Sequence, residues 1–125
     1  MRLYDTKCAL VTVGSNAPTS RKLSSGKLQV ALTEICSTGV DESVTVRSFT
    51  FSNTHTGQVV INITFSGDNE DDDYNIVSNM TLDSGDTLVL LEAGEEIGLA
   101  RQQRLMGSCD IVDVVEYASF GGRSV

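Results

Sequence analysis

The single histidine, His55, is the residue with the clearest potential for catalysis. A hydrolytic triad needs a histidine to shuttle the proton of its nucleophile, but no Gly-x-Ser-x-Gly elbow accompanies this one. Metal enzymes on jelly-roll folds need several imidazole ligands, and neither a P-loop nor a Gly-x-Gly-x-x-Gly loop occurs in the chain. We therefore interpret His55 as an ordinary loop histidine, and we expect no enzyme, no catalytic residue and no cofactor.

A run of acidic residues between Gly67 and Tyr74 raises the question of a calcium site. Ca²⁺ prefers oxygen ligands crowded in one loop, which makes Asp68, Glu70 and Asp72 candidate ligands. The spacing does not fit a helix–loop–helix site, because counting from Asp68 places Asp73 where that loop requires glycine. We favour a solvated hairpin loop that protects a sheet edge, with an irregular surface calcium site as the alternative.

Two pairs of carboxylates have the residue types needed for glycosidic acid–base chemistry. These are Glu95 with Glu96 and Asp110 with Asp113. Nothing distinguishes them from charges at strand ends, and the chain has no Trp and only three Tyr to form a platform for sugar stacking. We therefore expect these carboxylates to be solvated rather than catalytic.

The three cysteines, Cys8, Cys36 and Cys109, are too few and too far apart for a disulfide framework or a zinc site. The N-terminus lacks the apolar stretch of a secretory signal. We therefore expect a chain made and kept in a reducing cytosol, in which the cysteines are small core hydrophobes.

Length and charge restrict the class of protein further. A chain of 125 residues supports one domain, and no run of 18 apolar residues is present to span a membrane. The net charge is −8, and the stretch from Ser48 to Ala100 holds ten acids and no base. Such an acidic body would be repelled by phosphates and by anionic lipid, so we expect neither a nucleic acid nor a membrane as partner.

The pattern of apolar residues predicts an all-β fold. Val, Ile and Thr make up 32 of the 125 residues, and these β-branched side chains suit a pleated sheet. Alternation is clearest from Gln58 to Ser66 and recurs from Lys27 to Thr33, and Asp110 to Tyr117 is among the other short strands that we expect. Between Val44 and Ser52 the apolar phase slips by one residue, which predicts a bulge at Arg47-Ser48.

Turn signals recur every eight to twelve residues and separate about eight short strands. This rhythm predicts an antiparallel β-sandwich of jelly-roll type. Glu95 to Met106 contains good helix formers between glycines, so that a short turn, an exposed hairpin arm and a helix are all open. Leu88 to Leu91 is apolar on both faces, so we expect both faces of that strand to be covered. We expect one domain, 1–125, with terminal arms at 1–7 and 119–125.

The order of segments from Leu28 to Tyr117 resembles that of small bacteriophage virion proteins built as a compact β-sandwich. The matching phrases are Phe49-Thr50-Phe51-Ser52-Asn53, Val59-Val60-Ile61-Asn62-Ile63, Leu82-Asp83-Ser84-Gly85-Asp86-Thr87-Leu88, Leu91-Glu92-Ala93-Gly94-Glu95-Glu96-Ile97 and Asp110-Ile111-Val112-Asp113-Val114-Val115-Glu116-Tyr117. The stretch from Arg101 to Gly107 departs from that pattern, where a plainer hairpin is expected.

The resemblance implies a structural role in the virion, assembled in the host cytoplasm. A capsid decoration or cement protein would bind the major capsid protein or other virion proteins, and it would form a homo-oligomer, often a trimer. Alternatives are a tail or head–tail accessory protein and an adhesin domain that binds a host receptor or glycan.

Contacts with such partners would come from the segments that fit the sandwich least well. These are the two arms and the stretch from Arg101 to Gly107. The candidate contact residues are Arg2, Tyr4, Arg101, Arg104, Phe120 and Arg123. For the basic residues, among them Arg21, Lys22 and Lys27, the alternatives are solvated charge, pairing within the chain, and pairing with the acidic loops of an identical neighbour.

Overall fold

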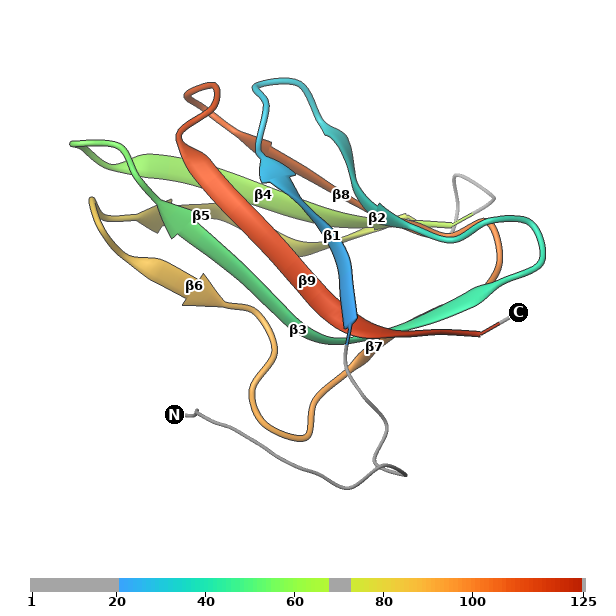
Figure 1. Ribbon diagram of the computed structural model, residues 1–125. Helices are drawn as coiled ribbons and strands as arrows, with labels where there is room; N and C mark the ends of the chain where they lie inside the picture. Colours follow the sequence, from blue (N-terminus) through green and yellow to red (C-terminus); the bar gives the residue numbers. More distant parts are fainter. Residues whose placement is uncertain (1–20, 68–72, 125) are drawn as a thin grey trace.

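The structure is a computed structural model, and it describes residues 21–67 and 73–124 (Figure 1). Within these ranges the chain forms nine strands and no helix, and the strands make two antiparallel sheets of a β-sandwich. Sheet A has the order β1-β9-β3-β6, with β7 also paired to β3, and sheet B has the order β2-β8-β4-β5. The strands are β1 (Arg21–Lys27), β2 (Thr33–Ser37), β3 (Ser43–Asn53), β4 (Val59–Ser66), β5 (Tyr74–Leu82), β6 (Thr87–Val89), β7 (Ile97–Leu99), β8 (Arg104–Cys109) and β9 (Val115–Ser124).

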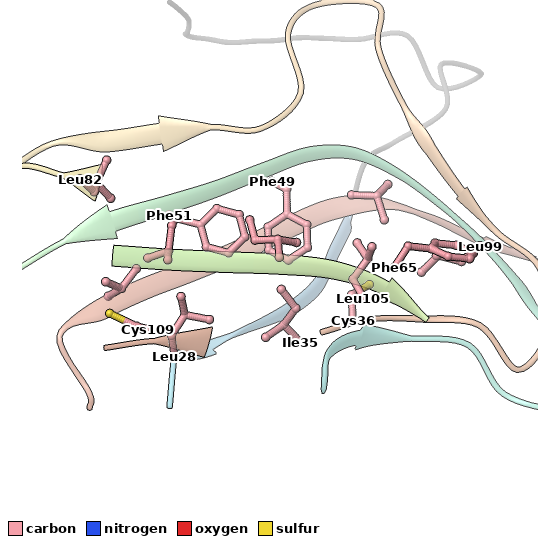
Figure 2. Packing of buried hydrophobic residues seen from close by; sticks show 14 of the residues in the cluster. Leu28, Ile35, Cys36, Phe49, Phe51, Phe65, Leu82, Leu99, Leu105 and Cys109 are labelled. Atoms are coloured by element: carbon pink, nitrogen blue, oxygen red, sulfur yellow. The ribbon is translucent and has the colours of Figure 1, made fainter. Parts of the chain in front are cut away.

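The core lies between the two sheets and is built from the alternating residues of β3 and β4. Phe49 and Phe51 are fully buried, and their rings stack with centroids 4.7 Å apart (Figure 2). On β4 the expected inward face is confirmed, since Val59, Ile61 and Ile63 are fully buried. Cys36 and Cys109 are buried in the same core, as the sequence predicted, whereas Cys8 lies outside the described residues.

The bulge expected at Arg47-Ser48 is confirmed. The pairing of β3 with β9 shifts register between Val46 and Ser48, so that Val46 and Phe49 both face the core. The other side of β3 pairs with β7 before the bulge and with β6 after it. The chain between these two short strands therefore leaves the sheet edge and returns to it.

The strand expected from Lys27 to Thr33 is mainly a loop, and the strand expected from Asp110 to Tyr117 is confirmed only from Val115, where β9 begins. Residues 28–32 connect β1 to β2, and residues 110–114 connect β8 to β9. Ser24, Ser25 and Gly26, which are residue types common in turns, lie within strand β1. The alternation at Leu28, Val30 and Leu32 was misleading, because Leu28 is buried at the end of the core while the other two side chains are exposed.

The C-terminal arm expected at 119–125 is wrong for residues 119–124. These residues belong to β9, which lies between β1 and β3 in sheet A and pairs with both. Ser119 is fully buried, and its hydroxyl lies 2.6 Å from that of Ser24 in the neighbouring strand. The N-terminal arm at 1–7 and residue 125 lie outside the described residues.

The segment Glu95 to Met106 is not helical. It forms β7 in sheet A, a turn, and the first residues of β8 in sheet B. Gln103 closes the turn, since its backbone N–H donates to Ala100 O at 3.3 Å and its side-chain Oε1 accepts from Ala100 N at 2.7 Å. The short-turn alternative is therefore correct, and the turn links the two sheets.

The strand from Leu88 to Leu91 is not covered on both faces. Only Thr87–Val89 forms β6, which lies at an edge of sheet A. Val89 is exposed, while Leu88 and Leu90 are partly buried against the core.

Candidate interaction surfaces

The residues with catalytic potential are held in turns. Asn53 Oδ1 accepts the backbone N–H of His55 at 2.8 Å, and the hydroxyl of Ser84 donates to His55 O at 2.6 Å. These contacts use the backbone of His55 and place it in the loop between β3 and β4. They fit the interpretation of His55 as a loop residue.

The two carboxylate pairs also have local structural contacts. Glu95 Oε1 accepts the backbone N–H of Glu92 at 2.9 Å. Asp110 Oδ1 accepts the backbone N–H of Val60 at 2.9 Å, and Asp113 Oδ1 accepts a hydrogen bond from Gln29 Nε2 at 2.7 Å. These carboxylates therefore stabilise the conformation of loops.

Within residues 21–67 and 73–124, no group of three or more His, Cys, Asp and Glu side chains is arranged to hold a metal ion. The calcium candidates Asp68, Glu70 and Asp72 lie outside those ranges. The nearby Asp73 accepts the backbone N–H of Gly67 at 3.1 Å through Oδ1.

The buried thiols are poor nucleophiles. Burial raises the pKa of the Cys36 thiol, and burial likewise raises the pKa of Cys109. Both side chains are therefore protonated at neutral pH, whereas the thiolate is the reactive form of cysteine.

Four of the six predicted contact residues are among those that the structure describes. Arg2 and Tyr4 lie outside the described residues. Arg101 and Arg104 are exposed in and after the β7–β8 turn, whereas Phe120 and Arg123 are on β9. Phe120 is partly exposed and pairs in register with Lys22 of β1.

Arg123 is engaged within the chain. Its Nη1 donates to Glu42 Oε1 at 2.6 Å and to Ser37 O at 3.3 Å, and its Nη2 donates to Leu23 O at 3.5 Å. Intramolecular pairing, one of the alternatives given for the basic residues, therefore applies to Arg123.

Three exposed aliphatic side chains in two neighbouring loops were not singled out from the sequence. Val30, Leu32 and Val112 are 60%, 48% and 48% exposed, respectively. The first two lie in the β1–β2 loop and the third in the β8–β9 loop, and these loops lie side by side at the upper left of Figure 1. We call these three residues the loop-end patch.

The two loops of the loop-end patch are fixed to each other by backbone hydrogen bonds. Leu28 N donates to Val115 O at 2.9 Å, Cys109 N donates to Gln29 O at 2.9 Å, and Asp113 N donates to Leu28 O at 3.2 Å. Asp113 adopts a left-handed conformation with φ of 63° and accepts the side chain of Gln29. The patch is therefore preorganised, a property that favours binding because less entropy is lost.

A second surface lies where β1 meets the end of β9. A hollow of about 490 Å³ is lined by Arg21, Lys22, Leu23, Gly121, Gly122 and Arg123. We call it the basic hollow, because three of its six residues are cationic and none is acidic.

A third surface is the chain between β6 and β7, which loops away from sheet A at the bottom of Figure 1. Its residues Glu92–Glu96, which we call the acidic turn, hold three exposed carboxylates and no base. The backbone N–H of Glu95 donates to Glu92 O at 2.9 Å, and Glu95 Oε1 accepts a hydrogen bond from the backbone N–H of Glu92. These two contacts give the turn a defined shape.

An apolar groove lies behind the acidic turn. It has a volume of about 500 Å³ and lies between the start of β5 and the acidic turn; its apolar lining is Tyr74, Ile76, Leu90, Leu91 and Ile97. Tyr74 stacks on Phe65 with ring centroids 5.0 Å apart. The groove follows the open edge of the sandwich between the two sheets.

A helix long and apolar enough to cross a membrane is not found in residues 21–67 and 73–124.

Comparison of the chain with protein-family models, with curated proteins and with solved structures finds no match.

Proposed function

We propose that the protein is a non-enzymatic structural component of a bacteriophage virion, most closely a capsid decoration or cement protein. The observation that carries the proposal is the strand order. If β6 and β7 are taken as one interrupted strand, because both pair with β3, the strands pair as a nested hairpin: β1 with β9, β2 with β8, β3 with β6 and β7, and β4 with β5. That order is the one expected of a jelly roll, an architecture used by viral capsid domains and also by lectins and cupins.

The protein would act by binding. The loop-end patch is the surface best suited to a neighbouring virion protein such as the major capsid protein, because its aliphatic side chains are exposed on a preorganised pair of loops. Complete burial of one such side chain contributes roughly 1.5–3 kcal/mol. Burial of three half-exposed side chains in each of many copies would stabilise a capsid by binding alone, with no reaction catalysed.

The proposal is tested on virions purified from infected cells that carry the gene. Quantitative mass spectrometry of the particles should find the chain at a fixed ratio to the major capsid protein. A tail or head–tail accessory protein would show a much lower fixed ratio than a decoration protein. Absence of the chain from particles would overturn the virion proposal.

Substitution of the loop-end patch identifies the binding surface. The variant V30S/L32S/V112S should bind purified particles lacking the chain at least tenfold more weakly than the natural sequence, with an unchanged fold. Val40→Ser is the matched control, because Val40 is equally exposed but lies in the β2–β3 turn. Equal binding by all three proteins would exclude the loop-end patch as the docking surface.

The adhesin alternative makes a different prediction, since jelly rolls also occur as lectins. An adhesin would bind host cells as an isolated domain. Binding to host cells, together with no binding to particles, would favour that function over decoration.

A further inference from the structure

The basic hollow is shaped to receive a negatively charged segment. Arg21 and Lys22 are exposed at the start of the edge strand β1. Gly121 and Gly122 contribute no side chains to the lining, and the guanidinium of Arg47 lies beside Gly122. Arg123 is held at the wall of the hollow by Glu42, which is the closest acid to it.

The cations of the hollow are organised by strand pairing. Arg21 pairs in register with Gly121, and Lys22 pairs with Phe120. The bulge between Lys22 and Ser24 follows directly, and Leu23 O at this bulge accepts from Arg123. The start of β1 and the end of β9 are therefore held together.

The acidic turn has the complementary charge. It carries Glu92, Glu95 and Glu96 without a base, and it leaves the sheet at the edge formed by β6 and β7. Glu96 has one distant basic neighbour, since its Oε2 lies 3.9 Å from Arg47 Nε. Both side chains of that pair are largely exposed, so the attraction is weak and does not commit Glu96 to it.

We propose that copies of this chain associate by inserting the acidic turn of one copy into the basic hollow of another. Arg21 and Lys22 of one copy would form ion pairs with Glu95 and Glu96 of the next. The occupant is a second copy because the chain carries both halves of the contact, at the two opposite edges of sheet A. Reciprocal insertion gives a two-fold dimer, and one-way insertion gives a ring. The contact goes beyond the proposed virion function, because purified protein alone is sufficient for it.

Charge reversal tests the contact on the purified full chain. Sedimentation velocity and light scattering across a protein concentration series should show a reversible oligomer for the natural sequence. R21E/K22E and E95K/E96K, each alone, should associate about tenfold to a hundredfold more weakly. Raising the NaCl concentration from about 0.05 M to 0.5 M should weaken the natural association as well.

Restoring the charge match provides the decisive comparison. An equimolar mixture of R21E/K22E and E95K/E96K should associate, because each variant then meets an opposite charge on the other. Lys27→Glu is the control for R21E/K22E: Lys27 is exposed at the far end of β1 and outside the hollow, and its reversal makes half the change in net charge, so this variant should associate like the natural sequence.

Three outcomes would overturn the proposal. A natural chain that stays monomeric at every concentration is the first, and an oligomer unaffected by either reversal is the second. The third is a pair of reversal variants that fail to associate when mixed although each remains folded by circular dichroism. None of these results bears on whether the chain is present in virions, so the two proposals fail independently.

Discussion

Arg123 Nη1 lies 2.6 Å from Glu42 Oε1, which joins the last strand of sheet A to the turn between β2 and β3. The same guanidinium donates to Ser37 O, at the end of β2 in sheet B. One side chain therefore links the two sheets at the end of the sandwich where the chain leaves β9. The C-terminal segment itself is a strand because its backbone pairs with both β1 and β3.

Removing this link should destabilise the fold moderately. We expect Arg123→Met to lower the free energy of unfolding by about 1 kcal/mol, because both partners are partly exposed and the ion pair is screened by water. Urea unfolding followed by circular dichroism measures the change. Arg101→Met, at an exposed turn, should have an effect below about 0.5 kcal/mol. Equal losses for the two variants would show that the Glu42 contact contributes nothing.

The sequence was sufficient to predict strands whose alternation coincides with burial. From Val59 to Phe65 one face is buried in the core and the other faces outward, so the period of two was informative. The phase slip near Arg47 was equally informative, because only an extra residue in one strand allows both Val46 and Phe49 to face the core.

The alternation of apolar and polar residues led to a wrong strand prediction where the apolar side chains are exposed. Val30 and Leu32 follow the pattern of a strand, but they belong to the β1–β2 loop and contribute to the loop-end patch. A pattern of residue types cannot separate a side chain buried in the core from one kept exposed at the surface. Such disagreements between local pattern and structure are expected at functional surfaces.

The basic hollow lay beyond sequence reasoning for a different reason. Arg21 and Gly121 are a hundred positions apart and become neighbours only through the register of β1 with β9. The small residues Ser119, Gly121 and Gly122 suggested an arm, whereas Gly121 lies too close to Thr45 of β3 for a side chain and Ser119 contacts Ser24 of β1. The acidic turn can be recognised in the sequence as a run of acidic residues, whereas the grouping of cations in the basic hollow cannot.

Asn53 organises the β3–β4 loop, and its loss should be costly. Its Nδ2 donates to Gly57 O at 2.9 Å and to Leu82 O at 3.0 Å, while Oδ1 accepts from His55 N. The side chain is 2% exposed, so Asn53→Ala leaves several buried polar groups unpaired. We expect a loss of about 2–4 kcal/mol in the free energy of unfolding.

Thr54→Val is the comparison for Asn53→Ala. Thr54 Oγ1 donates to Val114 O at 2.7 Å in an exposed position, where water can replace the lost bond. Thr54→Val should lower the free energy of unfolding by less than about 1 kcal/mol in the same urea titration. A loss for Asn53→Ala no larger than that for Thr54→Val would argue against a central role for Asn53.

Stability should fall in alkaline solution. Burial raises the pKa of Cys36 and also the pKa of Tyr117, so the folded state holds these protons at pH values where the unfolded state has released them. Their contribution is complete below the unfolded pKa values, about 8.5 for a thiol and about 10 for a tyrosine, and is lost as the pH rises above them. Urea unfolding between pH 7 and 11, with a reductant present, should show this decline.

Cys36→Ala separates the thiol contribution from the rest. The variant should be less stable at pH 7, because it leaves a small cavity in the core. Its stability should then decline less between pH 8.5 and 10 than that of the natural chain. Parallel curves would indicate that the Cys36 thiol has the same pKa in both states.

Gly121 should tolerate no side chain. A Cβ at this position would lie 1.9 Å from the backbone oxygen of Thr45, far inside any real contact distance, and backbone cannot move aside as a flexible side chain does. Since β9 lies between β1 and β3, a displacement there disturbs both pairings. We expect Gly121→Ala to lower the free energy of unfolding by more than about 3 kcal/mol or to prevent folding.

Gly98→Ala is the matched control, because nothing lies within 4 Å of its Cβ, and it should change stability by less than about 1 kcal/mol. Thermal unfolding of both variants by circular dichroism checks the contrast, and a stable Gly121→Ala protein would contradict the close approach of β9 to β3 at Thr45.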